Sequence, residues 1–312
     1  MQRAKGHDIM KIRYKEPKKL KIENKKLLEK MIKIIEHYGR EGYKLTLRQL
    51  YYSLVAQIII KNDKHEYAKI SRMLKDARMS GQVDWDIIED RIRVPQMHIQ
   101  FNSTDELLEV AINSYRRDRW KGQDEYIEVW VEKDALAGVL EPITEQYHVH
   151  LLVNRGYSST SAMHDSALRI KEEQENKKCT ILYFGDHDPS GEDMVRDLED
   201  RLKEFGCEVM VDKIALTMSQ VKKYHLPPNP IKMTDTRSIG YSFKHGDESW
   251  ELDALKPEIL RQLVVNNIEY HLNREKYDPI VELEERDKKA LRRFAKKFQA
   301  KKKKAKKRRG KK

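Results

Sequence analysis

The segment "TILYFGDHDPSGEDM", residues 180–194, joins an apolar run to two aspartates, Asp186 and Asp188, which are separated by one residue. On an extended segment this spacing points both side chains the same way. A third acid, Glu132, directly follows another apolar run, 126–131. Three neighbouring carboxylates repel one another unless a cation compensates them. Carboxylate oxygens suit Mg²⁺, with Mn²⁺ as an alternative, so we predict a divalent metal site formed by these three acids.

The other polar residues around this cluster have a simpler interpretation as parts of helix N-termini. Asp134, Glu192 and Asp193 fall where helices are expected to begin, and acids stabilise a helix N-terminus. Ser190 is expected to cap the helix that follows Asp188. The same interpretation, capping or solvated loop acids, is the alternative for the three metal-ligand candidates. His187, between the two aspartates, is interpreted as a bystander.

Apolar runs that alternate with helical patterns surround these acids. The runs "YIEVWV", "VHLLV", "CTILYF" and "CEVMVDKIAL" are expected to be strands, and the segments between them helices. This alternation predicts an α/β domain with a parallel sheet covered on both faces. Such sheets gather ligands at the carboxyl ends of their strands, where the three acids fall. Cys179 and Cys207 are interpreted as small core residues.

The N-terminal part of the chain has a different, helical rhythm. Residues 24–38 show apolar positions at helical spacing, and "LTLRQLYYSLVAQ" restarts a helix for which Thr46 is a plausible N-cap. A third helix is expected to end at Gly81, followed by a hairpin-like stretch. This order predicts a winged-helix domain over 23–100, a fold used for contacts with DNA or with protein.

Positive charge is concentrated at the two ends of the chain. The net charge is +12, yet residues 288–312 alone hold sixteen Lys or Arg and no acid. We therefore expect a basic arm at 1–22 and a lysine-rich tail at 287–312 that is disordered, or weakly helical where "LRRFAKKF" begins it. Both are suited to a polyanion through counterion release. A solubilising or targeting role is the alternative for the tail. Between them we expect a connector helix at 101–123 and, after the sheet domain, a C-terminal extension at 216–286.

No run of apolar residues approaches the roughly 18 that a membrane helix needs. The N-terminus also lacks the apolar stretch of a secretory signal. We therefore expect an intracellular protein, cytoplasmic or associated with the nucleoid, that has no membrane partner.

The acids in this βα alternation resemble the Toprim domain, which topoisomerases, bacterial primases and some nucleases share. The resemblance covers roughly residues 124–215 and depends on Glu132 together with the Asp-x-Asp motif. Upstream, the Arg-x-x-Tyr-Tyr sequence in "LRQLYYSL" lies in the expected winged helix. The combination resembles the catalytic subunit of topoisomerase VI and the related transesterase that makes meiotic double-strand breaks. The resemblance implies that Tyr52 attacks a DNA phosphodiester and that Arg48 assists it.

The residue chemistry agrees with these two roles. A phenol has a pKa of about 10, so it needs a nearby cation to react as phenolate at neutral pH. Arg48 and Tyr52 are four residues apart on one helix and therefore share a face. Tyr51 falls in line with Leu47 and Leu54 and is interpreted as a core residue. For Tyr52 the alternative is an ordinary half-buried aromatic residue.

Two further basic residues are candidates for holding DNA phosphate. Lys133 neighbours Glu132, and Arg155 in "NRGYSSTSA" follows the second expected strand. Glu251 and Asp253, in "WELDAL", are instead expected to cap a helix or to face solvent.

The resemblance implies double-stranded DNA as the substrate and a homodimer, because cutting both strands requires two tyrosines. In the related enzymes the tyrosine of one subunit works with the metal site of the other. Topoisomerase VI also needs a separate ATPase subunit, and no Walker motif occurs in this sequence. The chain therefore either has such a partner or cleaves DNA without passing strands.

Two other functions fit the same residues. One is a hydrolytic Toprim-type nuclease in which the metal activates water and Tyr52 is structural. The other is a non-catalytic DNA-binding protein with a degenerate site. A primase would require a zinc ribbon, which two cysteines cannot form.

Overall fold

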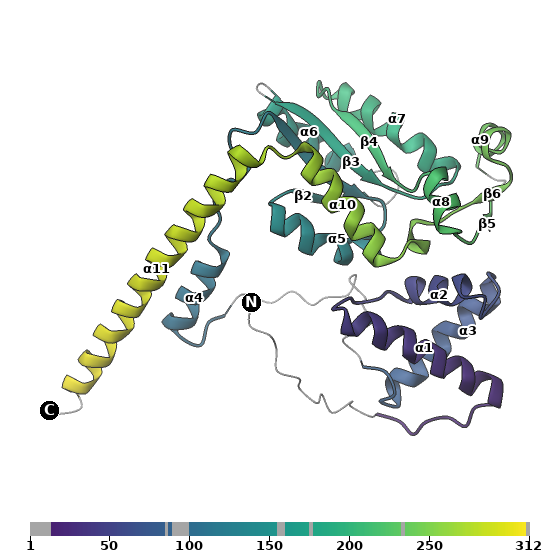
Figure 1. The fold of residues 1–312 in the computed structure, drawn as a ribbon, viewed down its shortest axis with the longest axis horizontal. Helices are drawn as coiled ribbons and strands as arrows, with labels where there is room; N and C mark the ends of the chain where they lie inside the picture. Colours follow the sequence, from purple (N-terminus) through teal and green to yellow (C-terminus); the bar gives the residue numbers. More distant parts are fainter. Residues whose placement is uncertain are drawn as a thin grey trace.

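A computed structural model describes six ranges of the chain: 14–84, 87–88, 100–154, 160–174, 177–231 and 235–309. Three helices near the N-terminus form one group, and a sheet covered by helices forms a second, larger part (Figure 1). The C-terminal helix, yellow in Figure 1, extends away from both. Within the described ranges, no helix is both long and apolar enough to cross a membrane.

The N-terminal group consists of α1 (Ile22–Arg40), α2 (Leu47–Ala56) and α3 (Lys64–Met79). The predicted N-cap Thr46 is confirmed, since its hydroxyl accepts a hydrogen bond from the Gln49 amide. The Gln49 side chain returns a bond to the Thr46 amide, which completes a capping box. Apolar residues of all three helices form one core. The hairpin expected after Gly81 falls largely on residues 85–86 and 89–99, outside the described ranges.

The larger part contains a four-stranded sheet in the order β2-β1-β3-β4. Its strands are β1 (Glu125–Val131), β2 (His150–Val153), β3 (Lys178–Phe184) and β4 (Met210–Ala215). All three pairings are parallel, as the alternation of strands and helices predicts. Because β1 and β3 are neighbours and end in register, their carboxyl ends meet at one edge of the sheet.

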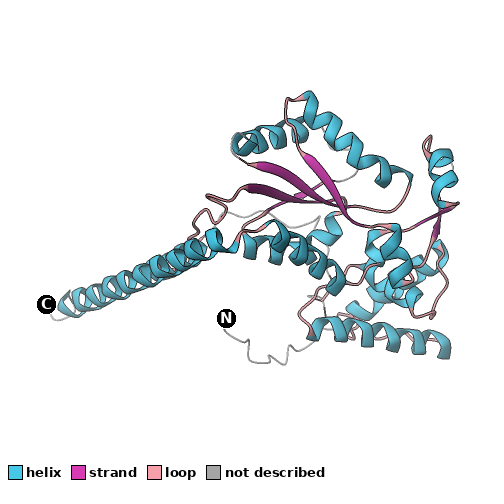
Figure 2. Cartoon of the chain, turned by 45° about the horizontal axis from the view of Figure 1, so that its top comes forward, coloured by secondary structure: helices cyan, strands magenta, loops and turns pink. Residues whose placement is uncertain are grey.

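Helices cover both faces of this sheet (Figure 2): α5 (Asp134–Tyr147) and α10 (Pro257–His271) on one, α6 (Thr160–Gln174) and α7 (Pro189–Glu204) on the other. Successive residues of β1 serve opposite faces, with Val129 in the core under α5 and Trp130 in the core under α6. Cys179 and Cys207 are free and buried, which confirms that they are small core residues.

A series of short elements follows β4: α8 (Met218–Tyr224), β5 (Asn229–Pro230), α9 (Ser238–His245), β6 (Glu248–Ser249) and the 3₁₀ helix η2 (Leu252–Ala254). Trp250 and His187 exchange backbone hydrogen bonds of 2.8 and 2.9 Å, which holds this segment against the end of β3. Ala254 packs against the core of the N-terminal helices. The segment 250–254 therefore joins the two parts of the molecule.

The C-terminal helix α11 (Arg274–Arg309) corrects the prediction of a disordered tail at 287–312. Residues 287–309 continue this helix, and only 310–312 lie outside the described ranges. The physical reason is composition, because the stretch holds Ala, Leu, Lys and Arg, all good helix formers, and contains no Gly or Pro before Gly310. Lys288 adds ion pairs one turn back, to Glu284 and Glu285.

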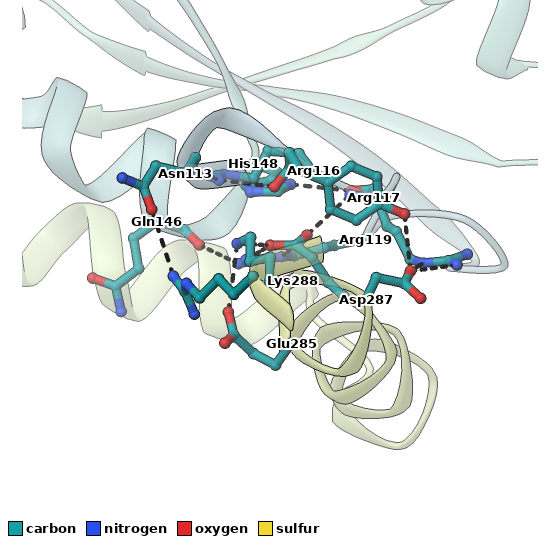
Figure 3. Close-up of polar contacts among 12 residues, drawn as sticks. Asn113, Arg116, Arg117, Arg119, Gln146, His148, Glu285, Asp287 and Lys288 are labelled. Atoms are coloured by element: carbon teal, nitrogen blue, oxygen red, sulfur yellow. Dashed lines mark hydrogen bonds and ion pairs between the residues drawn. The ribbon is translucent and has the colours of Figure 1, made fainter. Parts of the chain in front are cut away.

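The expected connector helix at 101–123 is also shorter than predicted. Helix α4 (Thr104–Ser114) ends early, and the chain that follows bonds by its side chains to α11 (Figure 3). Tyr115 and Arg117 both donate to Asp287, at 2.9 and 2.6 Å. These bonds hold the connector segment and α11 together near the body of the protein.

Candidate active site at the carboxyl ends of the strands

Glu132 and Asp186 meet where β1 and β3 end, as their positions in the sequence predict. The backbone amide of Glu132 donates to the carbonyl of Phe184 at 2.8 Å, which extends the pairing of the strands by one residue. The Glu132 carboxylate then accepts a hydrogen bond of 3.0 Å from the backbone amide of Asp186. The side chain of Asp186 is almost completely buried.

Asp188 is the N-cap of α7, a position that the sequence assigns to Ser190. Its Oδ1 accepts from the Gly191 amide at 2.7 Å and from the Ser190 hydroxyl at 2.9 Å. Both bonds use Oδ1, so Asp188 can cap the helix and offer its other oxygen to a ligand. A glycine is required at 191, since a Cβ there would lie 2.1 Å from the Asp186 carbonyl oxygen.

Lys133 lies inside a ring of acids. Its ammonium group is 2.8 Å from Asp186, 2.9 Å from Asp253 and 3.1 Å from Glu251, measured to carboxylate oxygens. Burial acts to lower the pKa of Lys133, but these three carboxylates outweigh it and raise the pKa. The phosphate contact expected for Lys133 would therefore require these ion pairs to break.

Glu251 and Asp253 belong to this cluster, whereas the sequence suggests capping and solvent exposure. They flank Leu252, whose backbone amide donates to Asp186 Oδ1 at 2.8 Å. The Asp253 side chain is fully buried, and among the described residues neither of its oxygens has a hydrogen bond of good geometry. Nothing local in the sequence distinguishes these two acids, because the fold brings them to the site from 65 residues beyond Asp186.

The helix that carries the tyrosine lies against the same cluster. Arg48 on α2 donates to Glu251 Oε2 at 2.6 Å, and Tyr52 accepts a hydrogen bond of 2.7 Å from the Asn229 side-chain amide. The sequence predicts the pairing of Arg48 with Tyr52 but not the contribution of Asn229. A chain of charged contacts thus runs from Arg48 through Glu251 and Lys133 to Asp186.

The Tyr52 phenol is protonated in this arrangement. Burial raises its pKa, and the neighbouring charge of Glu251 adds to the rise. The hydrogen bond from Asn229 and the charges of Arg48 and Lys133 oppose it without overcoming it. Asn229, Arg48 and Lys133 favour the phenolate, whereas burial, the larger effect, and the charge of Glu251 oppose it.

Tyr51 is a core residue, as predicted. Its ring is buried and packs edge-on against Tyr52 and Tyr67, with ring centroids 5.3 and 5.1 Å away. Its hydroxyl donates to the Asn62 side chain at 3.0 Å. The two adjacent tyrosines therefore have different surroundings, since Tyr51 bonds to the 62–63 segment and Tyr52 to Asn229.

A cavity of about 870 Å³ opens beside Tyr52 between α1, α2, α8 and the start of α10. Tyr52 and Asp253 both line it, so it connects the tyrosine to the acidic cluster. Basic side chains surround it: Lys30, Lys33, His37, Lys223, His225 and Lys256. These residues were not predicted from the sequence, where they are scattered over some 230 positions.

The remaining predicted residues are placed as follows. Arg155 lies outside the described ranges. Asp134 is the first residue of α5, and Glu192 lies in the first turn of α7, as expected for acids at helix N-termini. Asp193 lies beyond that turn and pairs with Arg196 and Arg237. His187 is buried and hydrogen-bonded to Tyr241, so it is part of the structure around the site rather than a bystander.

The structure brings the predicted ligands to one edge of the sheet, but the metal-ligating group found among the described residues is a different one, His187, Glu192 and His245. Glu132, Asp186 and Asp188 offer carboxylate oxygens at one sheet edge, and Asp253 adds buried oxygens that lack hydrogen bonds. Burial raises the pKa of Asp186, and Glu132 raises it further while Lys133 opposes the rise. Such a cluster gains from a second cation, and oxygen ligands of this kind suit Mg²⁺ or Mn²⁺.

A comparison with protein-family models and with curated proteins found no match for this chain in either set.

Proposed function

We propose that this protein is a metal-dependent, DNA-cleaving tyrosine transesterase that resembles the topoisomerase VI catalytic subunit. It acts on double-stranded DNA and leaves a covalent tyrosyl-DNA end, which it can rejoin. Helices α1 to α3 form the winged-helix domain of this enzyme, and the sheet with its strand-end acids forms the Toprim domain. Cutting both strands requires a homodimer, and strand passage requires a separate ATPase subunit.

The observation that carries the proposal is the basic cavity shared by Tyr52 and the acidic cluster. DNA is held chiefly through its phosphates, and lysines from α1, from α8 and from the position before α10 converge on this one cavity. A phosphate placed there lies beside Tyr52 and Asp253, the two residues of this site that line the cavity. An ordinary half-buried tyrosine needs none of these neighbours.

The reaction that fits these groups is an in-line transfer. The Tyr52 phenol gives up its proton to solvent and its oxygen forms a bond to phosphorus. The bond from phosphorus to the ribose oxygen breaks, and the departing oxygen takes a proton from solvent. Asn229 and Arg48 stabilise the phenolate, the first through its hydrogen bond and the second through its charge. A dication held by Glu132, Asp186 and Asp188 would supply further positive charge at the scissile phosphate.

The C-terminal helix adds affinity without sequence preference. Residues 288–309 carry most of the sixteen basic residues of the C-terminal end, so α11 presents them on a rod that extends from the body (Figure 1). Each lysine that neutralises a phosphate releases a counterion, which makes binding strongly dependent on salt.

A covalent trapping experiment tests the proposal. The protein is incubated with end-labelled duplex DNA and Mg²⁺ or Mn²⁺, quenched with detergent, and examined for label that migrates with protein. We expect an adduct that disappears in Tyr52→Phe and persists in Tyr51→Phe, which removes the adjacent, structural phenol. An adduct that survives Tyr52→Phe would refute the assignment of the nucleophile.

The second candidate is a hydrolytic Toprim-type nuclease, and the raised pKa of the buried Tyr52 phenol favours it. In that case the same experiment gives cut DNA ends without an adduct, and cleavage survives Tyr52→Phe. Binding that is indifferent to metal and to loss of Asp186, without any cleavage, would indicate a DNA-binding protein with a degenerate site.

A further inference from the structure

A second group of metal-ligating side chains lies beside the acidic cluster but uses none of its three predicted ligands. It consists of His187 after β3, Glu192 in the first turn of α7 and His245 in the last turn of α9. One ligand atom from each lies within 4.8 Å of the other two. We propose that these residues bind a transition-metal dication, zinc, that fastens α9 to the carboxyl end of the sheet.

The hydrogen bonds of His187 fix which of its nitrogens can bind a metal. The Tyr241 hydroxyl donates to the His187 carbonyl oxygen at 3.0 Å. The same hydroxyl lies 2.8 Å from His187 Nδ1, and since its proton is already committed, it accepts there from Nδ1–H. Nε2 then carries the lone pair. A metal-ligating histidine shows this pattern, in which the other ring nitrogen donates to a fixed partner.

The Nε2 lone pair faces other electron-rich atoms. It lies 3.9 Å from a carboxylate oxygen of Glu192. The His245 ring stands edge-on to the His187 ring, with centroids 4.8 Å apart. Electron pairs that converge in this way repel one another unless a cation lies between them.

The surrounding structure holds His187 in place. Its backbone exchanges two hydrogen bonds with Trp250, and its ring stands perpendicular to the Trp250 ring at 88°. The His187 side chain is only 2 % exposed. Glu192 and His245 are more accessible, so a metal ion has an entry path between α7 and α9.

The ligand types indicate zinc rather than magnesium. Two imidazoles and one carboxylate form a mixed set of nitrogen and oxygen ligands, which suits Zn²⁺, whereas Mg²⁺ prefers oxygen alone. Ligand atoms around a tetrahedral zinc lie about 3.3 Å apart. The three groups therefore need to move closer by about 1 Å, a change that rotation of the accessible Glu192 and His245 side chains provides.

Lys213 is the cation that now neutralises Glu192. Its ammonium lies 2.6 Å from Glu192 Oε1 and also donates to the Asp186 carbonyl oxygen at 3.0 Å. The Glu192 oxygen that lies nearest His187 is this same Oε1, so metal binding requires the carboxylate to turn until one oxygen keeps Lys213 and the other ligates the metal. Three protein ligands leave a fourth tetrahedral position for water.

Zinc binding by the full-length protein tests the inference. The protein is stripped with a chelator, dialysed into excess Mg²⁺ to saturate the oxygen ligands, and titrated with Zn²⁺ against a chromophoric zinc indicator. We expect one tight equivalent in the wild type, at least a tenfold weaker site in His245→Ala, and a similar loss in Glu192→Gln. The matched control His164→Ala removes an exposed histidine of α6 and keeps the site.

A second measurement separates lost binding from lost folding. Circular dichroism must show the same helix content in the variants, and zinc should raise the thermal unfolding midpoint of the wild type but not that of His245→Ala. The absence of a tight equivalent in the wild type would overturn the inference. So would zinc binding that His245→Ala and Glu192→Gln leave unchanged, because the metal would then reside elsewhere.

Discussion

Arg48 on α2 donates to Glu251 across 203 residues of sequence, with Nη1 and Oε2 2.6 Å apart. This ion pair connects the helix of Tyr52 to the acids of the sheet, because the same Glu251 oxygen also contacts Lys133. Arg48 lowers the pKa of Tyr52, and Glu251 raises it, so the two residues shift the pKa of Tyr52 in opposite directions. Because the two residues form an ion pair, the charge of Glu251 partly neutralises that of Arg48.

Arg48→Ala should slow DNA cleavage by about 10²-fold, the usual cost of removing one group that stabilises charge in a transition state. The measurement is the single-turnover rate of adduct formation under saturating protein. Arg196→Ala is the matched control, since Arg196 is also paired with acids, Asp193 and Asp200, but lies on α7, on the face of the sheet opposite α5. Equal rates for Arg48→Ala and the control would exclude the role assigned to Arg48.

Glu251→Gln should shift the pH dependence of cleavage to lower pH. The negative charge of Glu251 disfavours the phenolate and raises the pKa of Tyr52, so its removal lowers that pKa. The rate then begins to rise at a lower pH than in the wild type. Cleavage rates measured across the alkaline range give the shift, and an unchanged profile would show that Glu251 does not act on the nucleophile.

Lys133→Met should destabilise the protein and make its stability depend on Mg²⁺. Without the ammonium, Asp186, Glu251 and Asp253 repel one another in a buried site, and breaking such an arrangement costs about 3–5 kcal/mol. A dication bound among these acids replaces the lost positive charge and restores much of the lost stability. Thermal unfolding with and without Mg²⁺ measures the effect.

Lys256→Met, at an exposed position before α10, is the control for that change and should leave stability nearly unaltered. If Mg²⁺ protects Lys133→Met no more than it protects the wild type, the acids are not a metal site.

Several features that are local in the sequence were predicted correctly, although the N-cap of α7 is Asp188 rather than Ser190. The alternation of strands and helices, the N-cap at Thr46 and the meeting of Glu132 with Asp186 all follow from short-range patterns. The C-terminal end was expected to be disordered, or weakly helical only where "LRRFAKKF" begins it, and the helix extends much further because its alanines and lysines favour one.

The features that depend on long-range folding were not predicted. Glu251, Asp253 and Asn229 reach the site because Trp250 pairs with His187 and because η2 packs against α2. Neither hydrophobic periodicity nor a local motif predicts such contacts between distant segments. For the same reason Lys133, which neighbours a predicted ligand in sequence, was assigned to DNA although its ammonium faces three acids.

Charge reversal in the basic cavity should weaken DNA binding and lower its salt dependence. Lys33→Glu removes one lysine from the cavity lining, and each lost phosphate contact reduces the slope of log K against log salt by about 0.9. Fluorescence anisotropy with a labelled duplex at several salt concentrations measures both quantities. Lys178→Glu, at the start of β3 and thus at the opposite end of the sheet from the site, makes the same change of charge and is the control. If both variants lose affinity equally, overall charge rather than the cavity governs binding.

The attachment of α11 should depend on the ionised form of Glu284. Burial acts to raise the pKa of Glu284, but hydrogen bonds from Arg119, Lys288 and the Arg117 amide outweigh it and lower the pKa to about 2 from 4.5. Since the folded pKa lies below the unfolded one, the stabilisation is complete above about pH 4.5 and is lost as the pH falls toward 2. It amounts to about 3 kcal/mol.

Glu284→Gln should therefore reduce hydrogen-exchange protection of peptides that cover residues 280–292 at pH 7, and the difference from the wild type should shrink at pH 3. The neighbouring Glu285→Gln is the matched control. Its carboxylate is 49 % exposed and contacts Lys288 only at 3.4 Å, so an effect below about 1 kcal/mol is expected. Equal protection in the two variants at pH 7 would show that the buried carboxylate does not hold the helix, and α11 would then depend on the contacts of Asp287 with Tyr115 and Arg117.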